Sequence, residues 1–323
     1  MPEEERPLQQ QQRSRDIQIM HSNEESVETK LQRIAEKAGR DPECRFTSLF
    51  HLVDKELLLG CFNALKEGKA SGIDRITKEQ YAANLMENLD DLIGRLHRMA
   101  YIPQPVLRVY IPKAGSKKMR PLGIPALEDK LVQAALSKIL QAIYEQDFID
   151  DSYGFRPNRS CHDALRIINQ TITGKGTNYI VEADIKGFFD NVDQDELMEF
   201  LAHRIADKRV LRYIKRFLKS GIHEEGVFRA SEKGTPQGGV ISPVLANLYL
   251  HYTLDLWFQR KYLKTCTGTA RLIRYADDFV VCFKQEADAK RFRIEMEKRL
   301  NQYGLEIAPE KTKILEFGPQ AQK

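Results

Sequence analysis

The segment Arg271–Phe283, RLIRYADDFVVCF, limits what this chain can fold into more than any other. Two short apolar β runs are separated only by the residues ADD, and this spacing predicts a tight antiparallel hairpin with Asp277 and Asp278 at its tip. A second β run, TNYIVEADI, carries Asp184 near its end. Because aspartate is a common turn residue, each position alone indicates a turn rather than a functional site.

Considered together, the three aspartates indicate chemistry. Carboxylates held within a few ångströms repel and raise one another's pKa unless a cation neutralises them. Hard oxygen ligands in small number suit Mg²⁺. Two such ions about 3.5–4 Å apart can activate a 3′-hydroxyl and stabilise a leaving oxygen in phosphoryl transfer. The pattern therefore predicts that Asp184, Asp277 and Asp278 meet in one metal-binding pocket.

The distribution of charge is more informative than its sum. With 323 residues, 42% of them hydrophobic, the chain can form one large domain or two closely packed ones. A formal net charge of +4 does not by itself indicate a nucleic-acid partner. The window from Leu92 to Leu127, however, has no acidic residue, and its basic residues are Arg95, Arg98, Arg108, Lys113, Lys117, Lys118 and Arg120. This predicts a local positive surface, with an ordinary solvated face as the alternative.

Cysteine usage and hydropathy predict the compartment. The five cysteines are scattered without a CxxC pair, which argues against a disulfide framework and against a zinc site. No apolar run approaches membrane-spanning length, and the N-terminus lacks the apolar segment of a secretory signal. We expect a soluble cytoplasmic protein with no membrane partner.

Local signals predict most elements of the chain. The polar, glutamine-rich first 25 residues are expected to be disordered. Short β-branched runs predict a hairpin over 106–125, where the basic window lies. The predicted helices are 27–39, 54–68 with Asp54 as N-cap, 77–96 with a Thr77–Gln80 capping box, 126–145, one capped by Ser160 with Asp163, one capped by Asp193, and one opened by Pro243.

Several ordered blocks resemble a known family. YADD is preceded by Asp184 in the context DIKGFFDNVD, and the chain also contains KMRPLGIPALEDKLVQAAL, SYGFRPNRSCHDAL, KGTPQGGVISPVLANLYLH and GLEIAPEKTKI. The set resembles the group II intron-encoded reverse transcriptases, also called maturases, over about residues 46–318. YADD alone is a weak match, whereas several blocks in the family's order are specific.

The resemblance implies a mixed α/β (α+β) right-hand polymerase, with fingers and an antiparallel palm sheet backed by helices. The expected parts are an N-terminal extension over 1–45, fingers over about 46–125 and 192–236, a palm over about 126–191 and 237–318, and a tail over 319–323. Because the chain stops after GPQAQK, we expect the thumb and later domains to be missing and processivity to be low.

The family's catalytic residues match Asp184, Asp277, Asp278 and Lys311. Lys311 would be the general acid for the departing pyrophosphate, with a surface lysine as an equal alternative. The implied metal ligands are the three aspartates and the backbone carbonyl of Ile185, which together would hold two Mg²⁺ ions.

The residues implied to bind the incoming dNTP are Lys113, Arg120, Phe189 and Gln237. Lys113 and Arg120 would hold the triphosphate as a point charge and a bidentate fork, or else form a solvated hairpin face. Phe189 would be the steric gate that excludes a 2′-hydroxyl. Its neighbour Phe188 would face the core, because side chains alternate along an extended segment.

Template contacts are implied for Arg156 and Arg159, which would bind backbone phosphates without reading sequence. Lys117 and Lys118 would add generic RNA binding. One departure from the family is Arg75, which stands where a glycine is usual and is expected to alter a local turn.

The implied function is RNA-directed DNA polymerisation, with intron RNA binding during splicing. The alternative is an RNA-binding maturase module whose main role is intron RNA recognition. A nucleotidyl cyclase would not need the fingers hairpin or PQGG, and an RNA-dependent RNA polymerase would not need a bulky Phe189. The implied partners are group II intron RNA, an RNA template with a DNA primer, and dNTPs. The oligomeric state is left open, with a homodimer as one alternative.

Overall fold

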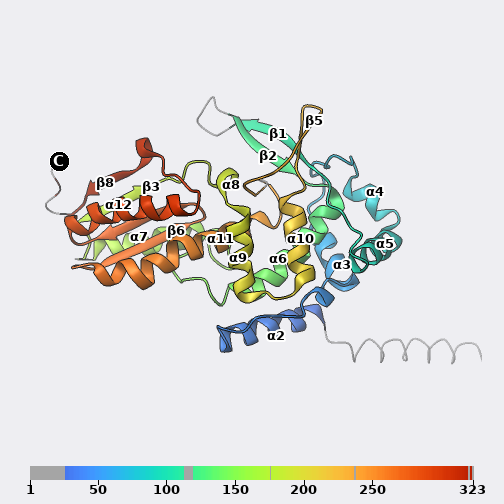
Figure 1. The fold of residues 1–323 in the computed structure, drawn as a ribbon, viewed down its shortest axis with the longest axis horizontal. Coiled ribbons are helices and arrows are strands. Elements are labelled where there is room, and N and C mark those ends of the chain that lie inside the picture. The colour runs from blue at the N-terminus through green and yellow to red at the C-terminus, as the bar shows by residue number, and fades with distance from the viewer. Residues whose placement is uncertain (1–25, 113–118, 175, 236–237, 319–320, 322–323) are drawn as a thin grey trace, which may run out of the picture.

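The computed structural model of the protein describes residues 26–112, 119–174, 176–235, 238–318 and 321 (Figure 1). The first 25 residues, predicted to be disordered, lie outside this set, as do four predicted site residues: Lys113, Lys117, Lys118 and Gln237. Every helix in the described ranges is too short or too polar to cross a membrane.

Four antiparallel strands form the palm sheet, in the order β6-β7-β3-β8 (Figure 1). They are β3 (Tyr179–Ala183), β6 (Ala270–Tyr275), β7 (Asp278–Phe283) and β8 (Lys313–Glu316). Side chains alternate between two packed faces. Val181 and Phe283 belong to the main core on the side of α12 (Glu286–Gln302), whereas Val280 packs on the side of α7 (Cys161–Thr173). Helix α12 covers one face, whereas the face of α7 keeps exposed polar side chains, among them Glu182 and Lys313.

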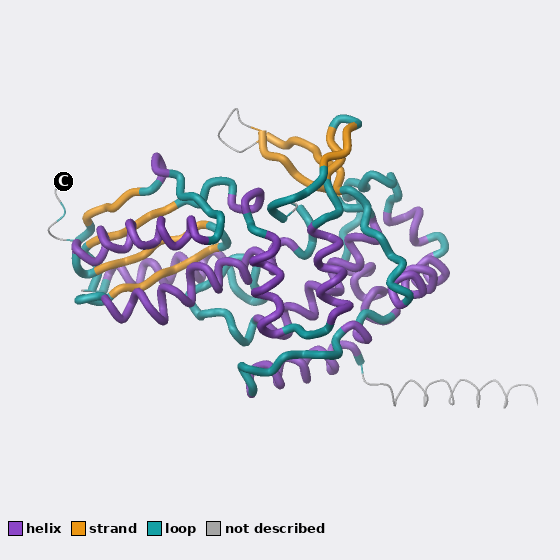
Figure 2. Tube along the Cα trace, in the orientation of Figure 1, coloured by secondary structure: helices purple, strands orange, loops and turns teal. Residues whose placement is uncertain are grey.

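A second sheet, the fingers sheet, has the order β2-β1-β4-β5 and projects from the helices in Figure 2. Its strands are β1 (Val106–Pro112), β2 (Met119–Ile124), β4 (Ile222–Glu224) and β5 (Val227–Arg229). The β1–β2 hairpin confirms the sequence prediction. The β4–β5 hairpin was not predicted, because strands of three residues are too short to show a clear alternation. The strands of each sheet lie inside the ranges expected for palm and fingers.

Helices join the two sheets. Helix α6 (Leu127–Tyr144) lies in the centre of the fold, with most of its side chains buried. The longer helices around it are α2 (Val27–Arg40), α3 (Lys55–Ala64), α4 (Lys78–Ala82), α5 (Leu85–His97), α9 (Gln194–Arg204), α10 (Lys208–Leu218) and α11 (Ser242–Leu250). The short helical turns are η1 (Phe50–Leu52), α8 (Phe188–Asn191), η2 (His251–Asp255), η3 (Phe258–Tyr262), η4 (Leu263–Thr265) and η5 (Pro309–Lys311). One hydrophobic core extends from α2 through α6 to the palm sheet, so these helices and the palm sheet share one interior.

The helix starts largely confirm the capping predictions. Asp54 accepts a hydrogen bond from the Leu57 backbone amide at 2.9 Å, and both predicted capping boxes are formed. Asp193 caps α9, and Pro243 lies in the first turn of α11. Two predicted helices are wrong in extent. The helix predicted over 54–68 ends at Ala64, and the span 77–96 breaks into α4 and α5 around Asn84, whose φ of −128° and ψ of 42° are not helical.

Candidate active site

The register of β3 against β7 brings two of the three predicted aspartates, Asp184 and Asp278, together. Ala183 pairs with Phe279, so the next residues in each direction are Asp184 and Asp278. Strand β7 begins at Asp278, which pairs with Tyr275 across the predicted hairpin. With period-two alternation, Asp184 and Asp278 share the face on which α7 packs. Both line a cavity of about 410 Å³, together with Lys311, Glu310, Tyr275 and Lys313.

Asp277 occupies the two-residue turn between β6 and β7. Its neighbour Ala276 is buried and has a φ of 57°, in the left-handed region that non-glycine residues rarely adopt. The turn packs closely against another segment, because a Cβ atom on Gly154 would lie 2.2 Å from the Ala276 amide nitrogen. The hairpin tip is therefore held from outside the hairpin.

The electrostatics of Asp277 show that the site is shared by several elements. Burial raises the pKa of Asp277 above its usual value, and the negative charge of Asp184 raises it further. The guanidinium groups of Arg120 and Arg274 act in the opposite direction on the same pKa. Arg120 is an exposed residue of β2, so the charge of the fingers hairpin reaches the palm carboxylates.

Lys311 forms an ion pair with Asp184, with 2.7 Å between Nζ and Oδ2. The hydrogen bond to Asp184 is the main cause that raises the pKa of the Lys311 ammonium. About half of the Lys311 side chain is exposed, compared with 32% for Asp184. An internal cation thus neutralises one of the clustered carboxylates.

The oxygen atoms at the site are of the type that binds a hard divalent cation, but they are not arranged as a complete coordination shell. Within the described ranges, no group of three or more His, Cys, Asp or Glu side chains is placed to hold a metal ion. Ile185 forms an isolated bridge with Ile307, in which the hydrogen bonds come from flanking residues. Its own carbonyl is therefore directed away from Ile307, toward the β7 side. Carboxylates from two strand ends and this carbonyl are the oxygen ligands that Mg²⁺ prefers.

The loop that carries the predicted nucleotide contact Gln237 can be located through its described neighbour. Gly238 has a φ of 102°, and a Cβ atom there would lie 2.2 Å from the Gly123 carbonyl oxygen of β2. Gly238 therefore packs against the fingers hairpin. Gln237 itself and the hairpin residue Lys113 lie outside the described residues, so their roles stay predictions.

Phe188 and Phe189 differ from the expected geometry. They belong to the short helix α8 rather than an extended segment, so alternation does not separate them. Both are buried, at 2% and 8% exposure, and their ring centroids are 5.3 Å apart. Phe189 contacts the ring of Phe155, which is half exposed. The steric-gate role of Phe189 therefore stays a prediction.

The predicted template contact of Arg156 does not fit its position. Arg156 is 6% exposed, and its guanidinium donates to Glu145 and to the carbonyl oxygens of Ile149 and Ser152. It therefore supports the loop that packs on the Ala276 turn, and little of its side chain is exposed for contact with a phosphate. Arg159 remains partly exposed, beside Asp150.

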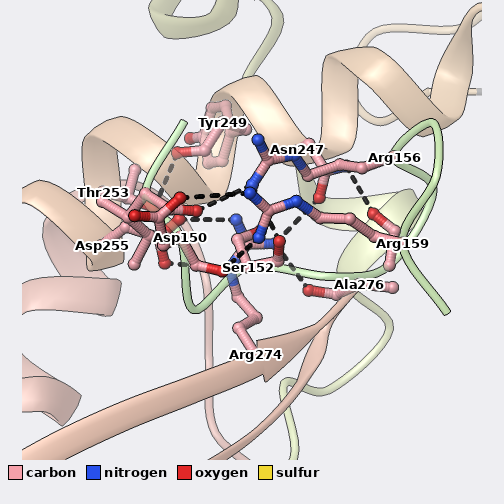
Figure 3. Close-up of polar contacts among 12 residues, drawn as sticks. Asp150, Ser152, Arg156, Arg159, Asn247, Tyr249, Thr253, Asp255, Arg274 and Ala276 are labelled. Atoms are coloured by element: carbon pink, nitrogen blue, oxygen red, sulfur yellow. Dashed lines mark hydrogen bonds and ion pairs between the residues drawn. The ribbon is translucent and has the colours of Figure 1, made fainter. Parts of the chain in front are cut away.

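Sequence reasoning missed three residues that support the catalytic turn: Arg274, Asn247 and Asp255. Arg274 is fully buried and donates to Asp255, Asn247 and the Ala276 carbonyl (Figure 3). The available signal was a charged residue in the middle of an apolar β run, which requires a buried partner.

Comparisons with known proteins agree with this geometry. Residues 111–321, more than half of the chain, match the family model "Reverse transcriptase (RNA-dependent DNA polymerase)". The group II intron-encoded protein LtrA of Lactococcus lactis subsp. cremoris is 40% identical over 222 residues, 68% of this chain and 37% of that protein. Protein YkfC of Escherichia coli (strain K12) is 35% identical over 284 residues, 78% of this chain and 74% of the relative.

A solved structure of telomerase from Candida albicans, in complex with a TWJ fragment of telomeric RNA, has the same fold. Its TM-score is 0.53 at 14% identity, over 76% of this chain and 47% of that one. The chain spans little more than a third of the Lactococcus relative but about three quarters of YkfC. These matches confirm the resemblance seen in the motifs: the chain belongs to the reverse transcriptase (RNA-dependent DNA polymerase) family and is similar to its group II intron-encoded members.

Proposed function

We propose that the protein adds deoxynucleotides to a primer 3′-hydroxyl on an RNA template, using Asp184, Asp277 and Asp278 as the catalytic carboxylates. The observation that carries this proposal is the β3–β7 register, by which Asp184 lies next to Asp278 at the start of β7. Family membership supports the same activity and nucleic-acid substrates.

The chain's own residues would divide the work. Asp184, Asp277, Asp278 and the Ile185 carbonyl would hold Mg²⁺, which supplies Lewis-acid stabilisation of the phosphates and a more acidic 3′-hydroxyl. Arg120, whose charge already reaches Asp277, would bind triphosphate oxygens. Lys311 would give up its ion pair with Asp184 and present its ammonium to the departing pyrophosphate.

The ring of Phe189 would lie beneath the sugar and exclude a 2′-hydroxyl, which gives the choice of deoxynucleotides. Intron RNA is the second proposed partner, because the similar Lactococcus protein is named as a group II intron-encoded protein. Polymerisation and RNA binding can coexist on one chain, since backbone phosphate contacts need no catalytic carboxylate.

The test is primer extension on an RNA template with dNTPs, with and without Mg²⁺. We expect extension that requires Mg²⁺ and disappears in the double variant Asp277→Asn/Asp278→Asn. RNA binding by the same variant, measured by filter binding, should persist. Asp195→Asn is a matched control, because Asp195 is an exposed aspartate on α9. Extension by the double variant at the wild-type rate would contradict the proposal.

A further inference from the structure

Arg274 is a charged residue completely removed from water. The side chains of Arg274 and Asp255 are both 0% exposed, and Arg274 is the largest fully buried side chain among the described residues. Its Nε and Nη2 donate to the two carboxylate oxygens of Asp255 at 2.9 and 2.5 Å. A buried ion pair of this kind is seldom better for stability than apolar residues of equal size, because both charges lose their hydration. Its presence therefore calls for a different reason.

The remaining hydrogen bonds of Arg274 indicate that reason. Its Nη1 donates to the carbonyl oxygen of Ala276 at 2.8 Å and to Oδ1 of Asn247 at 2.9 Å (Figure 3). Ala276 is the left-handed residue of the catalytic turn, directly before Asp277. The arginine side chain thus reaches forward along its own strand and binds the turn from inside the protein.

Asn247 connects the same turn to a separate segment. Its Nδ2 donates to the carbonyl of Gly154 at 2.7 Å, and Gly154 packs directly on the Ala276 backbone. The backbone of Arg274 is also paired with this segment, because its amide donates to Asp151 and its carbonyl accepts from Tyr153, both at 2.9 Å. The turn is therefore held between β6 and the loop before α7.

The anchors of this network come from one interrupted helix. Asn247 lies in α11 and Asp255 in the π-helical turn η2 that continues it. A π-helical turn inserts an extra residue per turn and often marks a functional site. Here it accompanies two buried polar side chains, Asn247 and Asp255, that face the same guanidinium.

We propose that Arg274 is a positioning residue for the polymerase reaction: anchored by Asp255 and Asn247, it holds the Ala276–Asp277 turn so that Asp277 and Asp278 stay in place beside Asp184. This inference rests on the proposed function only for its catalytic consequence. The claim that Arg274 orders the turn is independent of any activity.

The test replaces the ion pair by apolar residues of similar size, Arg274→Met/Asp255→Leu, so that neither charge is left buried alone. Overall thermal stability is expected to stay close to wild type. Hydrogen exchange in a peptide covering 270–283 should become at least about tenfold faster at the turn, because the hold on Ala276 is lost. Mn²⁺ binding to the protein alone, followed by electron paramagnetic resonance, should weaken about 10–100-fold, as for other losses of ligand-orienting partners.

In primer extension, kcat should fall about 10–100-fold while the KM for dNTP changes little, because substrate contacts are untouched. Arg166→Met is the matched control: Arg166 lies on α7, is paired with Asp163 and is 65% exposed, and all readouts should stay near wild type. If the double variant does not fold, Asn247→Ala tests the same idea, since it removes the tie to Gly154 and leaves the ion pair intact. It should also accelerate exchange and lower kcat.

Unchanged exchange at the turn in a folded variant would overturn the positioning role. A faster turn with wild-type Mn²⁺ binding and kcat would overturn its catalytic consequence. If the wild-type protein shows ordered exchange at the turn but incorporates no nucleotide, the proposed function fails and the structural role of Arg274 survives.

Discussion

A glycine pair offers a sharp test of how the loop at Gly238 is held against the fingers hairpin. Gly238 and Gly226 both have positive φ values, 102° and 84°, and both are exposed. They differ in their surroundings. A Cβ atom on Gly238 would lie 2.2 Å from the Gly123 carbonyl oxygen, whereas nothing lies within 4 Å of a Cβ atom on Gly226. Alanine at the two positions therefore separates backbone strain from a steric clash.

The magnitudes follow from these contacts. Gly226→Ala should cost about 1 kcal/mol of unfolding free energy, the usual penalty for a left-handed non-glycine residue. Gly238→Ala should cost about 1–3 kcal/mol more, because the loop must move away from β2. For a chain of 323 residues, with an unfolding entropy of about 2.1 cal/mol/K per residue, each kcal/mol corresponds to roughly 1.5 °C in Tm. Thermal denaturation of the two variants and wild type measures the difference.

The clash should also have a functional consequence at Gly238 alone. Its neighbour Gln237 is the predicted nucleotide contact, so displacing the loop should raise the KM for dNTP, whereas Gly226→Ala should leave it unchanged. Steady-state primer extension with varied dNTP gives this value. Equal stability and equal KM in the two variants would refute the inference that the loop packs on the hairpin.

Three further predictions concern single side chains. Lys311→Met should strengthen Mn²⁺ binding measured by titration, because no internal cation competes for Asp184, and should lower kcat if its ammonium serves the pyrophosphate; weaker binding would contradict the competition. Asp277→Asn should raise the free energy of unfolding at neutral pH, measured by urea denaturation. The pKa of Asp277 is raised in the folded protein, so ionisation of this carboxyl destabilises the wild type as the pH rises through its folded pKa. The stability gained by the variant should therefore vanish as the pH falls toward the ordinary carboxyl pKa of about 4. Arg75→Gly should raise the unfolding free energy by about 0.5–1 kcal/mol, because Arg75 has a φ of 58°, and Arg75→Ala should not.

The predictable parts of the fold are those fixed by neighbours in the chain. The capping boxes at Thr77 and Ser160 are local, since a side chain three residues away completes each one. The ADD hairpin was predictable because only two residues separate its paired ends, Tyr275 and Asp278. The sequence also predicted that Asp184 lies close to this hairpin, because Asp184 and the Asp277–Asp278 pair were all placed at strand ends.

What escaped prediction depends on tertiary packing. Arg156 resembles a surface arginine in sequence, yet Glu145 and two carbonyls bury it. Ala276 has none of the turn signals of glycine or asparagine, and its left-handed φ is held by contacts with Gly154 and Arg274. The partners of Arg156 lie only 4–11 positions away, but the burial that they share is set by packing that a short window of sequence does not show. Gly154 lies more than 100 positions from Ala276, so no short window contains both.

The cations around the aspartates are not equivalent, and the difference decides how the site can open. Arg274 is buried and fixed by Asp255, so moving it would leave an unpaired charge in the core. Lys311 is about half exposed, and its ammonium can return to water at little cost. If phosphates and a divalent cation bind as proposed, Lys311 would be the group that yields its place on Asp184, while Arg274 would keep the neighbouring turn fixed. In this proposal the buried cation would serve the geometry of the turn and the exposed cation would serve the chemistry.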